Sequence, residues 1–284
     1  MSAVDTVERE APKNTGALQR ELARVAREWP STVKRLQSLL ANVVVAQMLP
    51  DAAVTGGTGL KLRFGENVTR DTPDLDAAFR GDRDAFLADF TTRLSHGWGS
   101  FAGKAVMREQ RAPADLVQRV STAYVTLPVD IKLSYRGKPF TTVELELGYD
   151  ELEATTREPV EHELSDEIAR LFADVGLPTP DPVRVLPLHH QISQKLHACS
   201  EPGSPRAHDL VDLQLMCPQV DPVKVAETCV RLFRFRQSHS WPPTVVAADG
   251  WAQRYEAAAE GLDVRGLDDA ITWINEYIAD VAAL

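Results

Sequence analysis

The sequence predicts an α/β protein in which a lobe with a mixed β-sheet is followed by a helical lobe. Residues 131–135 and 143–147 alternate apolar and polar side chains, which is typical of half-buried strands. From about residue 187 onward, apolar residues recur instead at the spacing of helical turns. A connection containing Pro178, Pro180 and Pro182 separates the two parts. We therefore expect one lobe over residues 1–180 and a second over residues 181–284, each able to bury a core.

Apolar spacing and turn residues predict the individual elements. Residues 1–15 carry scattered charge without an apolar period, so they are expected to be flexible. In the first lobe we expect helices at about 18–27, 30–44, 83–94 and 162–175, and strands at 52–55, 60–64, 75–79, 105–108, 120–135 and 140–147. In the second lobe the expected helices are 187–199, 205–217, 221–238, 250–261 and 266–282.

The composition is that of an ordinary globular protein, with 44% hydrophobic and 25% charged residues. No apolar run is long enough to span a membrane and residues 1–13 are polar, so we expect neither membrane anchoring nor secretion. Cys199, Cys217 and Cys229 lie in apolar helical segments without CxxC spacing. They are expected to be reduced, buried thiols of a cytoplasmic protein, and not zinc ligands or a disulfide framework.

The net charge of −10 argues against a broad nucleic-acid-binding surface, but the charges are segregated. Basic residues dominate residues 104–138, and residues 231–239 contain no acid. The acidic excess lies mainly in residues 144–174 and 249–280. This segregation suits a protein that holds RNA along one side, with Arg234 and Arg236 as contacts. Solvated charged faces also arise without a ligand, and both interpretations stay open here.

Residues 56–76 carry the most specific chemical signal in the first lobe. Gly56, Gly57 and Thr58 form a glycine-rich turn, in which backbone N–H groups and a hydroxyl can hold phosphate oxygens. Asp74 and Asp76 lie two positions apart on a predicted strand, so both side chains point to one face and can share a divalent cation. A metal that links carboxylates to the phosphates of a nucleotide is the minimal machinery for phosphoryl or nucleotidyl transfer.

A second group of polar residues lies in the predicted helical lobe. Lys195 is at the edge of an apolar helical stripe, and Asp209 and Asp212 share a face with apolar residues of the next helix. A charge turned toward a core needs a partner, because an unpaired buried charge is very costly. One interpretation is a structural salt bridge from Lys195 to Asp209 or Asp212. The other is that Lys195 and Asp209 belong to a functional site.

Together the two segments resemble the AbiEii/AbiGii toxin family, whose mycobacterial members are called MenT toxins. The resemblance covers about residues 50–217. Residues 56–60 with Asp74 and Asp76 are similar to the signature of polymerase-β-like nucleotidyltransferases, and residues 186–213 are similar to the family's segment that carries a lysine and an aspartate. The resemblance implies a polymerase-β-like first lobe in a toxin of a two-gene toxin–antitoxin module. Better-studied members transfer nucleotides from an NTP onto the 3′ end of tRNA.

The resemblance also implies a metal site that activates the 3′-hydroxyl of an RNA. Asp74 and Asp76 would hold Mg²⁺ or Mn²⁺ against the α-phosphate of the NTP. A third carboxylate commonly comes from a neighbouring strand in such enzymes, and Asp130 is assigned to that position. Glu144 and Glu146 compete with Asp130 for the same role.

Further residues are implied to bind the nucleotide. Gly57 and Thr58 would cradle the triphosphate, and Lys195, with Arg63 or Arg70, would neutralise its β- and γ-phosphates. Asp209 would orient Lys195 or reach the nucleobase or sugar. We expect NTP and tRNA as substrates, a cognate antitoxin as a partner, and a monomer. Protein nucleotidylation, phosphoryl transfer and a non-catalytic binding module are the alternatives on the same scaffold.

Four histidines cluster in the sequence at positions 189, 190, 197 and 208, which raises the question of a metal site. On a helical wheel His190 and His197 fall on the polar side, and no partner with metal-ligand spacing recurs elsewhere. A zinc site at these histidines is therefore disfavoured from the sequence.

Overall fold

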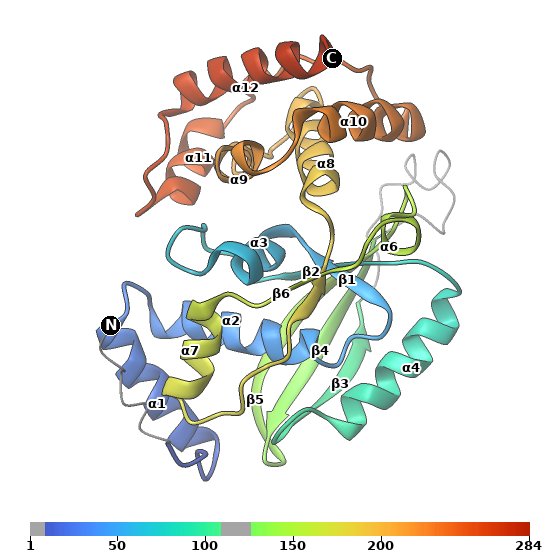
Figure 1. Ribbon diagram of the computed structural model, residues 1–284. Helices are drawn as coiled ribbons and strands as arrows, with labels where there is room; N and C mark the ends of the chain where they lie inside the picture. The colour runs from blue at the N-terminus through green and yellow to red at the C-terminus, as the bar shows by residue number, and fades with distance from the viewer. Residues whose placement is uncertain (1–8, 109–125) are drawn as a thin grey trace. The chain divides into compact units, whose positions relative to one another are not determined.

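The computed structural model describes residues 9–108 and 126–284 (Figure 1). It divides into two compact units, each built from separate stretches of the chain. The first comprises the chain up to Asn67, Thr72–Tyr149 and His162–Val185, and the second comprises Val68–Asp71, Asp150–Glu161 and Leu186–Leu284. Two short early segments therefore complete the C-terminal helical unit. Arg111, Arg119 and the beginning of the strand expected at 120–135 lie outside the described residues.

A seven-stranded sheet forms the frame of the first unit, in the order β3-β4-β5-β2-β1-β7-β6. The strands are β1 (Ala52–Thr55), β2 (Leu75–Phe79), β3 (Phe101–Met107), β4 (Leu127–Tyr135), β5 (Lys138–Tyr149), β6 (Glu161–Glu163) and β7 (Val183–Val185). The β3–β4, β4–β5 and β1–β2 pairs are antiparallel, whereas β2–β5 and β1–β7 are parallel. The predicted mixed α/β class is confirmed.

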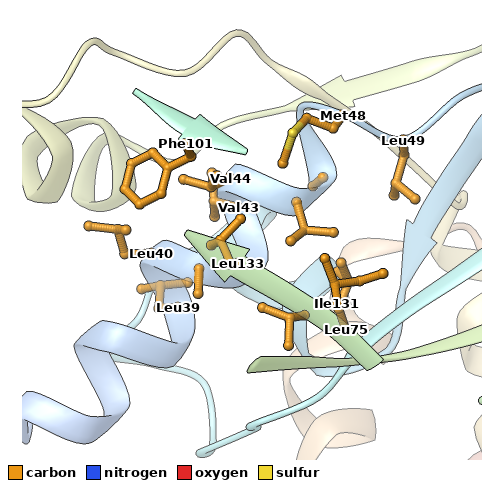
Figure 2. Packing of buried hydrophobic residues seen from close by; sticks show 14 of the residues in the cluster. Leu39, Leu40, Val43, Val44, Met48, Leu49, Leu75, Phe101, Ile131 and Leu133 are labelled. Atoms are coloured by element: carbon orange, nitrogen blue, oxygen red, sulfur yellow. The ribbon is translucent and has the colours of Figure 1, made fainter. Parts of the chain in front are cut away.

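The first unit also contains the helices α1 (Thr15–Glu28), α2 (Val33–Ala46), α3 (Gly56–Phe64), α4 (Arg83–His96) and α7 (Asp166–Asp174). Helix α2 begins where the hydroxyl of Thr32 accepts a hydrogen bond from the N–H of Arg35. Its buried leucines and valines share one hydrophobic cluster with Leu75, Ile131 and Leu133 of the sheet (Figure 2). Because strand side chains alternate between faces, Asp76 and Glu146 point to the side opposite these core residues.

The expected strand at residues 60–64 is wrong, because these residues belong to helix α3. The alternation of Leu60, Lys61 and Leu62 resembles a strand with one polar face. All three side chains are buried, however, since the ammonium of Lys61 is held by Glu66 at 2.6 Å. A buried ion pair thus lets a lysine occupy an interior helical position, which the alternation of residue types cannot reveal.

Other boundaries also differ from the prediction. The helix expected at 162–175 is preceded by strand β6, and α7 begins only after Ser165, whose hydroxyl accepts from the N–H of Ile168. The short strand β7 follows the proline-rich connection, where only helices were expected. Strand β3 begins at Phe101, four residues before the expected start.

The second unit contains α8 (Leu188–Ser200), α9 (Asp209–Met216), α10 (Pro222–Arg236), α11 (Trp251–Ala259) and α12 (Leu267–Ala282), with the short α6 (Ala154–Arg157) and a 3₁₀ turn, η2 (Cys217–Gln219). Helix α8 packs against α9 and α10, and α9 in turn contacts α11 and α12 (Figure 1). Helix α9 begins later than the predicted residue 205. Among the described helices, none has both the length and the apolar character needed to span a bilayer.

The three cysteines lie inside this second unit. All three are free and buried, in agreement with the prediction. Burial raises the pKa of Cys217 and of Cys229 to about 12, so both thiols stay protonated at neutral pH.

Candidate active site

The carboxylate of Asp76 lies directly against the backbone of Gly56. The register of β1 and β2 pairs Thr55 with Asp76, and Gly56 follows as the first residue of α3 with φ of +60°. A Cβ atom at position 56 would lie 2.8 Å from the Asp76 carboxyl carbon and closer still to its Oδ2 atom. Only glycine accommodates both the backbone angle and this close approach. The predicted glycine turn therefore meets the predicted carboxylate strand.

The other residues of the glycine turn contact the segment just before β2, at Thr72 and Asp74. The hydroxyl of Thr58 is fully buried and donates a hydrogen bond to the backbone oxygen of Asp74 at 3.0 Å. Asn42 of α2 donates to the same oxygen and to the Thr58 hydroxyl, each at 3.1 Å. A Cβ at Gly57 would be 2.7 Å from the side chain of Thr72. The contacts of Gly57 and Thr58 with a triphosphate stay a prediction.

Asn42 was not among the predicted site residues. Its one available signal was that it stands alone as a polar residue in the run Leu39–Ala46, which the structure shows to be buried throughout. A polar side chain in such a run must find partners, because an unpaired buried amide costs free energy. The partners, Thr58 and Asp74, are not predictable from the spacing in the sequence.

Strand register distinguishes the three candidates for a third carboxylate. Asp76 of β2 is directly opposite Glu146 of β5, so their side chains are neighbours on one face of the sheet. Asp130 lies on β4, which is separated from β2 by β5 and thus by two strand spacings, about 10 Å. The carboxylate of Asp130 is also paired with Arg108 and with Lys132, each at 3.2 Å. The register favours Glu146 over Asp130 and over Glu144, which is opposite Asp130.

In the second unit, Lys195 of α8 is buried between two carboxylates of α9. Its Nζ atom lies 2.8 Å from Asp209 Oδ1 and 2.7 Å from Asp212 Oδ2. Asp209 also accepts from Arg206 Nε at 2.8 Å, and Asp212 from Arg70 Nε at 3.0 Å. Arg70 belongs to the short early segment of this unit. The predicted salt bridge of Lys195 is thus present with both aspartates.

Three basic side chains and two carboxylates meet in this cluster. Burial alone would lower the pKa of Lys195, but Asp209 and Asp212 raise it above its ordinary value. Burial would raise the pKa of Asp209, but Lys195 and Arg206 lower it, so the carboxylate is ionised. Three cations, Lys195, Arg70 and Arg206, face two carboxylates. His208 adds no charge at neutral pH, because burial lowers its pKa to about 4.

The remaining predicted cations are partly engaged within their own units. Arg63 Nη1 lies 2.8 Å from Glu163 Oε1, and only 8% of the Arg63 side chain is exposed. Arg236 Nη2 lies 2.9 Å from Glu151 Oε2, whereas Arg234 is exposed in the last turn of α10. Contacts of these residues with phosphate or RNA stay predictions.

Known protein families and solved structures include relatives of this chain. Residues 38–276 match the family model described as nucleotidyl transferase AbiEii toxin, type IV toxin–antitoxin system. The structure is similar to MenT4, a nucleotidyltransferase toxin from Mycobacterium tuberculosis H37Rv, with a TM-score of 0.55 and 15% identity, over 93% of this chain and 98% of that chain. At this identity the similarity shows the fold alone. JHP933 from Helicobacter pylori has a TM-score of 0.45 and 14% identity, over 86% of this chain and 89% of that chain.

The comparison with curated proteins gives no match. The family model, however, spans most of the chain and includes the glycine turn, the Asp74–Asp76 strand and the Lys195 cluster. The chain therefore belongs to the AbiEii family of nucleotidyltransferase toxins of type IV toxin–antitoxin systems.

Proposed function

We propose that this nucleotidyltransferase toxin transfers a nucleoside monophosphate from an NTP to the 3′ end of an RNA, with tRNA as the acceptor, and that the reaction depends on Mg²⁺ or Mn²⁺. The observation that carries the proposal is the position of the Asp76 carboxylate, against Gly56 and beside Glu146. Asp74 lies directly before this strand, and its backbone oxygen accepts hydrogen bonds from Thr58 and Asn42. Carboxylate oxygens are the ligands that Mg²⁺ and Mn²⁺ prefer, so the residues present fit the metal.

Asp74 and Asp76 would hold the metal, with Glu146 as the favoured third carboxylate and Asp130 as its competitor. The bound metal would neutralise charge on the phosphates and lower the pKa of the attacking hydroxyl. In the transfer, the 3′-oxygen of the RNA bonds to the α-phosphorus while the bond from that phosphorus to the departing pyrophosphate breaks. The hydroxyl proton passes to a carboxylate or to water. Catalysis of this kind relies on positioning and on charge stabilisation.

The basic side chains gathered around Lys195 support a role in binding the triphosphate. Lys195 and Arg70 would neutralise the β- and γ-phosphates and the departing pyrophosphate, and Asp209 would orient Lys195. Gly57 and Thr58 would contribute to the triphosphate site through the glycine turn. Arg63 would first have to release Glu163, which makes Arg70 the better arginine for this role.

The acceptor and the partner are proposed from charge and family. Exposed Arg234, with Arg236, would contact the phosphates of tRNA, because the segment around them contains no acid. A cognate antitoxin would be the protein partner, and the acidic residues 249–280 offer it a surface of opposite sign to a basic protein. We further propose a cytoplasmic monomer.

The test is to incubate the purified protein with each labelled NTP, Mg²⁺ and total tRNA. Labelled RNA is the expected result. Labelled protein would instead show protein nucleotidylation, and no labelling of either would contradict the proposed reaction. The Asp76→Ala variant should lose labelling while remaining folded. Asp84→Ala, on the exposed first turn of α4, is the matched control and should retain it.

A second pair of variants tests the assignment of the third carboxylate. Glu146→Gln should reduce labelling strongly, because the amide is a poor metal ligand next to Asp76. Asp130→Asn should leave most of the activity, since its partners are Arg108 and Lys132. A strong loss of labelling in Asp130→Asn, with most of the activity kept in Glu146→Gln, would instead assign Asp130 to the metal site.

A further inference from the structure

Glu158 is in contact with two consecutive histidines at the start of α8. Glu158 follows the short helix α6 in the second unit. The Nε2 atom of His189 lies 2.9 Å from Glu158 Oε2, and that of His190 lies 2.6 Å from Glu158 Oε1. The two imidazole rings have centroids 4.5 Å apart. Three side chains that are common metal ligands therefore present their ligand atoms to one point.

The spacing of the ligand atoms suits a single ion. One ligand atom from each of the three residues lies within 4.8 Å of the others. Tetrahedral zinc has Zn–N and Zn–O distances of about 2.0–2.2 Å, so its ligand atoms are separated by roughly 3.3 Å. The present separations of 2.6 and 2.9 Å would need to widen by roughly half an ångström to admit the ion. A change of χ angles in Glu158, whose side chain is 22% exposed, would supply this movement.

The three side chains are largely shielded from solvent. The side chain of His189 is 13% exposed, that of His190 3% and that of Glu158 22%. His190 also lines a small cavity together with Asp150 and Gln194.

We propose that Glu158, His189 and His190 form a binding site for a divalent transition metal, for which Zn²⁺ is the best match. Two imidazoles and one carboxylate occur together in zinc sites and also in non-haem Fe(II) sites, whereas Asp74 and Asp76 offer only oxygen, which suits Mg²⁺. The bound ion would join residues 150–161 to α8 within the second unit. The site is independent of the proposed nucleotidyl transfer. The sequence disfavoured zinc because no partner with metal-ligand spacing recurs near the histidines, and Glu158 lies thirty-one positions before His189.

The test is a zinc titration of the full-length protein after removal of metals with a chelator, in a buffer with excess Mg²⁺ to occupy oxygen-only sites. Isothermal titration calorimetry should show one high-affinity equivalent of Zn²⁺, and Co²⁺ should give the visible absorption of a tetrahedral site. His189→Gln and Glu158→Gln should each weaken Zn²⁺ binding by at least about tenfold. His96→Gln, an exposed histidine of α4 in the first unit, is the control and should leave binding unchanged.

Unfolding measurements separate metal binding from a loss of structure. Zn²⁺ should raise the Tm of the wild-type protein and leave that of His189→Gln unchanged, because a ligand stabilises only the state that binds it. His189 is the more exposed of the two histidines, so its variant should fold in the absence of metal. Absence of zinc binding would overturn the proposal, and so would binding that neither His189→Gln nor Glu158→Gln affects. In either case the cluster is a hydrogen-bonded pair of histidines and no metal site.

Discussion

Replacing Gly56 with alanine tests whether the Asp76 carboxylate needs its present position. A Cβ at residue 56 would lie 2.8 Å from the carboxyl carbon of Asp76, whereas ordinary contacts begin at 3.4 Å. The carboxyl group must therefore move by at least the difference, 0.6 Å. Misplacement of a catalytic group by about 1 Å can cost about 100-fold in rate. We expect Gly56→Ala to lower NTP-dependent labelling of RNA by about tenfold or more.

Alanine at this position also strains the backbone, and a control variant must separate this strain from the displacement of the Asp76 carboxylate. Gly56 has φ of +60°, and a left-handed conformation costs alanine about 1–2 kcal/mol. Gly137, in the β4–β5 hairpin, has φ of +73°, and among the described residues no atom lies within 4 Å of the place that a Cβ would take there. Gly137→Ala therefore imposes similar strain without the clash, and both variants should lose a similar free energy of unfolding in urea.

The two variants should differ in activity. Gly137→Ala should label RNA at close to the wild-type rate, and Gly56→Ala should not. A Gly56→Ala protein that labels RNA as well as Gly137→Ala would refute the inference that the glycine positions the carboxylate. Loss of activity in both variants would attribute the effect to strain alone.

Three other sets of variants probe the contacts of the second unit. Lys195→Met should lower the free energy of unfolding by about 3 kcal/mol, because two buried carboxylates lose their shared ammonium, whereas Lys132→Met, at an exposed pair, should cost less than about 1 kcal/mol. Lys195→Met should also lose labelling of RNA, because the lysine is proposed to bind the phosphates, and full stability of the variant would contradict the cost assigned to the ion pairs. Burial lowers the pKa of His197 to about 3, and the positive charges of Arg236 and His239 add to this effect. Because the ordinary pKa of histidine in the unfolded chain is about 6.5, the unfolded state binds a proton at a higher pH than the folded state does. The free energy of unfolding, measured in urea, should consequently fall between pH 7.5 and pH 5. This fall should be smaller for His197→Gln than for the wild-type protein. Reversal of Arg234 and Arg236 to Glu should weaken tRNA binding and reduce its salt dependence without affecting NTP binding, as measured by fluorescence titration. A tRNA affinity that changes neither with the charge reversal nor with the salt concentration would mean that the RNA binds elsewhere.

The sequence predicted the parts of the fold that depend on local pattern. The alternation around Ile131 and Val143 marks strands because one face of the sheet is buried under α2. The same rule failed in α3, where Lys61 is buried by an ion pair. The glycine turn and the Asp74–Asp76 pair were predicted to act together, and the β1–β2 register brings Asp76 against Gly56.

Partners far apart in the sequence could not be predicted. Arg70 and Asp212 are separated by 142 positions, and Glu158 and His190 by 32, so no periodicity connects them. The choice among carboxylates depended likewise on strand order, which puts Glu146 and not Asp130 beside Asp76. Residue types indicate which side chains need partners, but the topology decides which partners they receive.

The segmented composition of the second unit has a consequence for its synthesis. Arg70 and Glu158 are synthesised before α8 and α9. Their contacts with Asp212 and with the two histidines can therefore form only after these later helices have been made. A fragment beginning at Leu186 would contain every large helix of this unit and still lack both residues. In that fragment Asp212 would lack its contact with Arg70, and the two histidines at the start of α8 would lack Glu158. Expression of the C-terminal helices alone is therefore not a substitute for the whole chain.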